Sequence, residues 1–142
     1  MRYLLDTNVC VDYLSGRYPS VAARLQRSSP EEICLSSVVV AELRSGADRS
    51  RRRRENHERL DLLTAEIPCV DFDLTAAAAF GRVRVTLEEK GVAIGPYDML
   101  IAAQALALGL VLVTANLREF ERVVGLELES WREPEAPSLK TR

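Results

Sequence analysis

The stretch Arg2-Tyr3-Leu4-Leu5-Asp6-Thr7-Asn8 decides the fold. A short apolar run without polar alternation is typical of a strand that is buried on both faces of a sheet. The polar residues that begin at Asp6 predict that this strand ends at Leu5. The pattern returns at Leu110–Val113, where Thr114-Ala115-Asn116 follows the apolar run. Both stretches therefore predict buried parallel strands with polar side chains at their carboxyl ends.

Apolar runs and helical segments alternate along the rest of the chain. Further strands are predicted at residues 33–35, 69–70 and 126–128, and helices over residues 8–15, 20–27, 38–47, 49–65, 73–90, 97–108 and 117–123. The predicted N-caps are Asn8, Ser20 and Asp73, and Gly46 lies near an expected helix break. This alternation predicts an α/β fold whose mostly parallel central sheet is covered by helices on both faces.

Length and composition indicate one globular domain. The chain has 142 residues, of which 47% are hydrophobic and 28% are charged. We expect residues 1–132 to form a single domain and residues 133–142, with Pro134 and Pro137, to be an unstructured tail. No apolar run approaches the roughly 18 residues that span a bilayer. An aspartate at position 6 argues against a signal peptide, so a soluble protein of the cytoplasm is expected.

Three carboxylates occupy positions that point to chemistry. Asp6 follows the first strand, Glu42 follows a run of small and apolar residues, and Asp98 lies in the first turn of a nearly apolar helix. Each has a structural alternative, as a helix cap, a first-turn acid or part of an exposed stripe. Because Asn8 is available as the cap, Asp6 is one acid more than capping requires. A lone carboxylate in a buried stretch is costly unless it is paired or binds a metal.

Asn116 and Glu119 follow the apolar strand at 110–113. The Asn116 amide is able to cap the next helix, to accept a hydrogen bond or to touch a cation. Glu119 stands three residues later, which is the spacing of a capping box. Glu119 therefore has a good structural explanation and ranks as a secondary candidate.

The acidic positions together predict a metal site. Carboxylates that lie close together repel each other, and a divalent cation offsets that repulsion. Ligand oxygens without Cys or His point to Mg²⁺ or Mn²⁺. The chemistry expected is metal-assisted hydrolysis of a phosphate ester. The sequence has no Walker loop, no GxGxxG and no promising Ser-His-Asp arrangement, since His57 lies in a charged segment.

The cysteines give no sign of a site. Cys10, Cys34 and Cys69 are odd in number, stand in apolar stretches and form no CxxC pair. With a single histidine in the chain, a zinc site is excluded on ligand count and spacing. We expect three buried free thiols.

Several of these motifs resemble those of the PIN-domain nucleases. The resemblance rests on Leu5-Asp6-Thr7-Asn8, on Ser37 with Ala41-Glu42-Leu43, and on Asp98 with Ile101-Ala102-Ala103. Residues 113–120 and 124–131 are similar to the VapC toxin branch of that family. The similarity covers about residues 1–131, and it implies a PIN-like three-layer α/β/α fold.

The resemblance implies a Mg²⁺- or Mn²⁺-dependent endoribonuclease toxin of a type II toxin–antitoxin pair. Asp6, Glu42 and Asp98 match the family's acidic metal site, and Asn116 stands where many members carry a fourth acid. Thr7 and Thr114 match hydroxyl positions that support the site. The partners implied are structured RNA such as tRNA, a VapB-type antitoxin, and a second copy in a homodimer or a toxin–antitoxin hetero-oligomer.

Two other functions remain open on the residues alone. The first is a catalytically inactive module that binds nucleic acid or a protein partner. The second is a phosphoryl-transfer domain with Asp6 as nucleophile, although the second aspartate which that site requires two residues later is replaced by Asn8.

An arginine run stands out against a net charge of −2, and 17 of the 19 Lys and Arg residues are Arg. Codon bias explains that preference as well as bidentate binding of phosphate or carboxylate does. The run itself has three interpretations, namely a solvated helix with pairs such as Arg51–Glu55 and Arg54–Glu58, a phosphate-binding patch, or a contact for an acidic partner. Its members are Arg49, Arg51, Arg52, Arg53 and Arg54.

Overall fold

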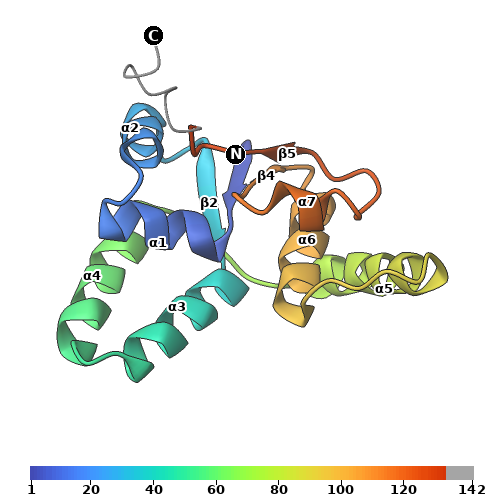
Figure 1. The fold of residues 1–142 in the computed structure, drawn as a ribbon, viewed down its shortest axis with the longest axis horizontal. Coiled ribbons are helices and arrows are strands. Elements are labelled where there is room, and N and C mark those ends of the chain that lie inside the picture. Colours follow the sequence, from blue (N-terminus) through green and yellow to red (C-terminus); the bar gives the residue numbers. More distant parts are fainter. Residues whose placement is uncertain (134–142) are drawn as a thin grey trace, which may run out of the picture.

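Five short parallel strands form the centre of the molecule, and helices pack on both sides of them (Figure 1). The computed structural model describes residues 1–133. Its elements, in chain order, are β1 (Tyr3–Leu5), α1 (Thr7–Ser15), α2 (Pro19–Arg27), β2 (Ile33–Ser36), α3 (Ser37–Arg49), α4 (Arg53–Glu66), β3 (Cys69–Val70), α5 (Leu74–Glu89), α6 (Pro96–Leu108), β4 (Val111–Val113), α7 (Leu117–Phe120) and β5 (Leu128–Glu129). The predicted α/β fold with a parallel sheet is confirmed.

The direction in which strands are added to the sheet reverses between β1 and β4. The sheet runs β3-β2-β1-β4-β5, and all four neighbouring pairs are parallel. The chain moves outward from β1 through β2 to β3, and then returns to the other side of β1 for β4 and β5. Ligands of open parallel sheets bind at such a reversal, outside the carboxyl ends of the strands. Leu5 pairs with Val113 in the register, so Asp6 and Thr114 both follow the strands at this point.

Burial of the strands explains their apolar composition. Leu4, Leu5, Leu35 and Leu112 have no exposed surface and belong to one continuous core between the helix layers. Full burial of a leucine side chain stabilises a fold by about 1.5–3 kcal/mol. The central strands are therefore anchored in the core up to the residues that follow them.

Gln104 is the polar exception in the core. Its side chain is 1% exposed, although it lies in the apolar helix α6. Its Nε2 donates to the carbonyls of Val70 at 3.2 Å and Asp71 at 2.9 Å, and its Oε1 accepts from Ser36 Oγ. Every polar atom of this amide is thus used, and α6 is tied to the ends of β2 and β3.

Two predicted helix caps are wrong. Helix α1 starts at Thr7, and Asp6 is its N-cap, because Asp6 Oδ1 accepts from the Val9 amide at 3.0 Å. Asn8 lies inside the helix. Helix α2 starts at Pro19, and the hydroxyl of Ser20 donates instead to the Trp131 carbonyl at 2.9 Å. The cap of α5 at Asp73 is confirmed by its bond from the Ala76 amide.

The predicted helix boundaries also change in three places. Helix α3 continues past Gly46 to Arg49. The single helix expected over 49–65 is wrong, since residues 50–52 turn the chain before α4 begins. Near the C-terminus, α7 ends at Phe120 rather than 123, and the last strand lies at Leu128–Glu129 rather than 126–128.

The end of the described chain is fixed to α1. Arg132 Nε and Nη2 contact the two carboxylate oxygens of Asp12 at 2.6 and 2.8 Å, and the guanidinium lies 4.0 Å from the centre of the Tyr18 ring. The Glu133 amide donates to Ser20 Oγ at 3.0 Å. The predicted tail begins at residue 133, and its remainder, 134–142, lies outside the described residues. Among the described helices, none combines the length and apolarity needed to cross a membrane.

Candidate active site

Asp6 lies buried at the carboxyl end of β1. Its amide donates to the Val113 carbonyl at 3.0 Å, which holds the residue between β1 and β4. Asp6 is 4% exposed and Thr114 is fully buried. Burial raises the pKa of Asp6, while the hydroxyl of Thr114 and the amide of Val9 act in the opposite direction. Asp6 is therefore both the cap of α1 and a carboxylate at the point where the strand order reverses, and the two roles do not exclude each other.

Glu42 reaches this edge from the second turn of α3. Its Oε1 accepts a 2.7 Å hydrogen bond from the hydroxyl of Thr7, the first residue of α1. The side chain is half-buried. The cost of placing this carboxylate in an apolar stretch is reduced by its hydrogen bond from the Thr7 hydroxyl. Thr7 fixes one oxygen of Glu42 and leaves the other free to act.

Burial and neighbouring carboxylates raise the pKa of Asp98 strongly. It lies half-buried in the first turn of α6, directly after the Gly95-Pro96 turn. Burial, followed by the charge of Glu119, raises the pKa of Asp98 to about 7, and Asp6 and Glu42 add to the shift. A first-turn acid that only answered a helix dipole would have a lowered pKa. The electrostatic coupling therefore groups Asp98 with the carboxylates of α1, α3 and α7.

Glu119 belongs to this group rather than to a capping box. Its Oε1 accepts from the Gly95 amide at 3.0 Å, and its Oε2 accepts from the Asn116 side-chain amide at 2.5 Å. Asn116 is exposed and makes no side-chain cap for α7. The capping-box interpretation is wrong because Glu119 reaches across to the start of α6. No local pattern in the sequence indicates that contact.

The donor set fits a hard divalent cation. Asp6, Glu42, Asp98 and Glu119 offer only carboxylate oxygens, which Mg²⁺ and Mn²⁺ prefer. The raised pKa of Asp98 shows negative charge that a cation would offset. Within residues 1–133, no group of three His, Cys, Asp or Glu side chains is placed so that it could hold a metal ion as it stands. The four carboxylates come from four separate places in the fold, namely the residue before α1, α3, α6 and α7.

Two hollows open beside Glu42. One, of about 470 Å³, lies between α1, α3 and α4, and its wall includes Thr7, Glu42, Arg49 and Arg59 beside apolar side chains. The other, of about 200 Å³, is formed by Ala41, Glu42, Ser45, Arg49 and Tyr97. Arg49 and Glu42 border both hollows.

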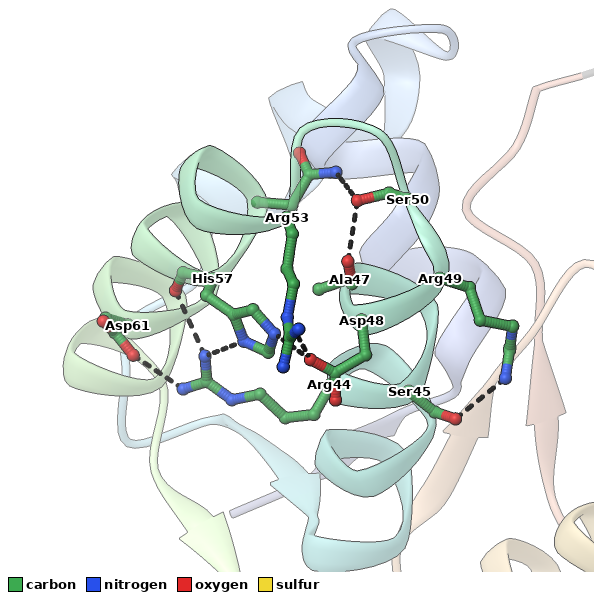
Figure 2. Close-up of polar contacts among 10 residues, drawn as sticks. Arg44, Ser45, Ala47, Asp48, Arg49, Ser50, Arg53, His57 and Asp61 are labelled. Atoms are coloured by element: carbon green, nitrogen blue, oxygen red, sulfur yellow. Dashed lines mark hydrogen bonds and ion pairs between the residues drawn. The ribbon is translucent and has the colours of Figure 1, made fainter.

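Three arginines of the run, Arg52, Arg53 and Arg54, form ion pairs with neighbouring acids. Figure 2 shows Arg53 beside Asp48 where the chain turns from α3 into α4. Arg53 pairs with Asp48 at 3.0 Å, and His57 bonds the same oxygen at 2.8 Å. The predicted Arg54–Glu58 pair is confirmed at 3.4 Å. The predicted Arg51–Glu55 pair is wrong, because Glu55 lies nearest Arg52, at 3.8 Å.

None of the three cysteines is among the site residues, although the Cys10 amide donates to the Asp6 carbonyl at 3.3 Å. Cys10 and Cys34 are buried, and burial raises the pKa of both. Cys69 is exposed, so the prediction of three buried thiols is wrong for this residue. It lies on the edge strand β3, where its side chain leaves the core.

Residues 3–126 match the PIN domain. The chain belongs to the PIN-domain family, among its VapC-type ribonuclease toxins. This PIN domain is 37% identical over 132 residues to Ribonuclease VapC2 of Rickettsia felis, a match covering 92% of this chain and 98% of the relative. It is also 37% identical to the tRNA(fMet)-specific endonuclease VapC of Shigella flexneri, with the same coverage. Members of the family are typically metal-dependent nucleases.

Solved structures agree with the sequence matches. The crystal structure of DNA-bound VapBC from Salmonella typhimurium superposes with a TM-score of 0.88 at 35% identity, covering 92% of this chain and 98% of that one. VapBC2 of Rickettsia felis, bound to a promoter fragment, gives a TM-score of 0.84 at 36% identity, covering 92% and 99%. The resemblance noted in the sequence, the PIN-like fold and the ribonuclease activity are thereby confirmed.

Proposed function

We propose that this VapC-type ribonuclease hydrolyses phosphodiester bonds of structured RNA, such as tRNA, with Mg²⁺ or Mn²⁺ at the carboxylates beside β1 and β4. The observation that carries the proposal is the 3.0 Å hydrogen bond from the Gly95 amide to Glu119 Oε1, which brings this carboxylate to the start of α6, where Asp98 lies in the first turn. The raised pKa of Asp98 agrees with this arrangement. Asp6 and Asp98 are the ligands we assign, with Glu42 as a further ligand or the group that positions the attacking water.

The chain's own residues prepare this site in three ways. Thr7 holds Glu42 Oε1 through a 2.7 Å hydrogen bond and so limits the orientations of this carboxylate. The hydrogen bonds from Thr114 and from the Val9 amide favour the charged form of Asp6 and offset part of the effect of burial, which raises its pKa. Asn116 fixes Glu119, and its amide is available to orient a water or the substrate. A bound divalent ion supplies Lewis-acid polarisation of the phosphate and a lower pKa of its water.

Cleavage of tRNA by the purified protein tests the proposal. We expect products with Mg²⁺, none with EDTA, and none from Asp98→Asn in Mg²⁺. Cleavage that persists in EDTA or in the variant would refute the metal site. Absence of cleavage with any RNA would favour an inactive binding module, and a phosphoprotein trapped on Asp6 would favour phosphoryl transfer.

We further propose that a VapB-type antitoxin restrains the enzyme in the cytoplasm and that the toxin forms a homodimer or a toxin–antitoxin hetero-oligomer. The support is that the Salmonella typhimurium and Rickettsia felis structures are VapBC complexes on DNA. Co-expression with the product of an adjacent short reading frame tests this. A stable complex that no longer cleaves RNA is the expected result, and a monomeric toxin with undiminished activity would contradict it.

A further inference from the structure

The smaller hollow beside Glu42 has the size and chemistry of a nucleotide subsite. Its volume of about 200 Å³ lies between the middle and C-terminal part of α3 and the start of α6, and its lining includes Glu42, Arg49 and Tyr97. Pockets for drug-sized molecules measure roughly 300–1,000 Å³, so this hollow suits one smaller group. Because Glu42 and the neighbour of Asp98 both line it, an occupant lies directly beside the carboxylates.

Arg49 is the positive charge of this hollow. Residues 42, 45 and 49 share one face of α3, and Arg49 Nη1 donates to Ser45 Oγ at 2.9 Å. Figure 2 shows Arg49 on the side of α3 away from the network of Arg44, Asp48 and His57. Between residues 1 and 133, no carboxylate forms an ion pair with Arg49, whereas Arg52, Arg53 and Arg54 each have one. Its guanidinium is therefore available for a phosphate.

Tyr97 is the aromatic wall of the hollow. Its side chain is 57% exposed, which is unusual for a large ring in the first turn of a helix that packs its next turns into the core. It precedes Asp98 directly, so the ring lies at the rim of the carboxylate site. Exposed tyrosines beside an arginine are how proteins hold unpaired RNA bases, through stacking and a phosphate contact.

We propose that this hollow binds one unpaired nucleotide next to the phosphate that is cut, with the base stacked on Tyr97 and a backbone phosphate on Arg49. The inference rests on the proposed RNA hydrolysis at the adjacent carboxylates. A base-paired strand keeps its bases inside the duplex and offers none to Tyr97, so a duplex serves as the negative control.

The test is fluorescence anisotropy of a short unpaired oligoribonucleotide in EDTA, followed by single-turnover cleavage in Mg²⁺. Tyr97→Ala is expected to weaken binding roughly tenfold, and Tyr97→Phe to keep it, because stacking needs the ring and not the hydroxyl. Arg49→Gln is expected to weaken binding by a similar factor and to lower the slope of log K against log salt by about 0.7, the value of one phosphate contact.

Two matched variants separate a built subsite from general charge attraction. Arg27→Gln removes the same charge from the exposed end of α2, and Arg51→Gln removes it from the turn after Arg49. Both are expected to change affinity less than twofold. An equal loss in Arg51→Gln and Arg49→Gln would overturn the proposal in favour of a diffuse basic patch.

The remaining outcomes of these experiments separate the nucleotide subsite from the proposed hydrolysis and from a contact with the antitoxin. Unchanged binding by Tyr97→Ala, or equal binding of a duplex and an unpaired strand, would overturn the subsite while wild-type cleavage upheld the proposed function. If the wild type failed to cleave RNA while the variants still showed the expected changes in binding in EDTA, the proposed hydrolysis would be refuted and the nucleotide subsite would be supported. A Tyr97→Ala protein that loses affinity for the co-expressed antitoxin but not for RNA would overturn the proposal and assign the hollow to the protein partner.

Discussion

Thr7 Oγ1 donates a 2.7 Å hydrogen bond to Glu42 Oε1 and so links the first turn of α1 to α3 across 35 residues of sequence. Asp6, the preceding residue, caps the same helix. Two consecutive residues after β1 therefore position two carboxylates, since Asp6 places its own and Thr7 holds that of Glu42. A hydrogen bond to a charged group is worth about 1.5–3 kcal/mol, so the link controls where Glu42 points.

Thr7→Val is expected to slow single-turnover RNA cleavage by roughly tenfold to a hundredfold, which corresponds to the loss of that hydrogen bond. Thr7→Ser keeps the hydroxyl and should stay within a few-fold of the wild type. RNA affinity in EDTA should be unchanged in both, since Thr7 holds Glu42 and not the substrate. Equal activity of the valine and serine variants would show that Glu42 needs no orientation by Thr7.

Asp98→Asn is expected to stabilise the metal-free protein while abolishing cleavage. Burial and the neighbouring carboxylates raise the pKa of Asp98 to about 7, so its charge opposes folding at pH 8. We expect the free energy of unfolding, measured with urea in EDTA, to increase by about 1–2 kcal/mol. A pKa shift corresponds to ~1.4 kcal/mol per unit for a fully buried group, and the expected gain is smaller because solvent screens a half-exposed side chain.

The sign of the pH dependence follows from the raised pKa. The wild type takes up a proton at Asp98 on folding, and it therefore gains stability as the pH falls from about 7 toward the ordinary value of 3.8. The asparagine variant lacks this titration, so the difference between the two proteins should narrow from pH 8 to pH 5. A constant or widening difference would contradict the coupling of the carboxylates.

The strand ends could be predicted from the sequence, whereas contacts between elements far apart in the chain could not. Leu4-Leu5-Asp6 and Leu112-Val113-Thr114 mark two buried strands whose carboxyl ends share an edge, and the register confirms this. The three-residue spacing from Asn116 predicts a capping box for Glu119, because sequence spacing reveals only contacts between residues that are close along the chain. Its actual partner, the Gly95 amide, is 24 residues away and is set by the packing of α6 beside α7.

Helix caps show the same limit at shorter range. Asp6 and Asn8 both carry suitable oxygens two residues apart, and composition alone does not choose between them. The strand register decides, because the Asp6 amide bonds Val113 and leaves its carboxylate above the Val9 amide. The exposed position of Cys69 follows likewise from the place of β3 at the sheet edge.

Gln104→Leu is expected to destabilise the fold by about 2–3 kcal/mol, although it replaces an amide by an apolar side chain of similar size in the core. The change leaves the carbonyls of Val70 and Asp71 without their shared donor. Urea unfolding measures the loss. Leu106→Met, on the same helix and of conserved volume, should cost less than about 1.5 kcal/mol and serves as the control. A gain in stability by Gln104→Leu would show that the amide is dispensable.

Arg132→Ala is expected to cost about 3 kcal/mol in urea unfolding, because it leaves the buried Asp12 carboxylate without its partner. Asp12→Asn in the same background removes that charge and should recover part of the loss, since an uncharged amide is less costly to bury than a carboxylate. Because the charge of Asp12 acts on Asp6 and that of Asp6 acts on Arg132, the readout is urea unfolding and not RNA cleavage. The proposed role of the ion pair would be contradicted if the protein with both Arg132→Ala and Asp12→Asn were less stable than Arg132→Ala alone. In that case Arg132 and Asp12 would contribute independently to stability, and their ion pair would not anchor Trp131 and the end of the described chain to α1.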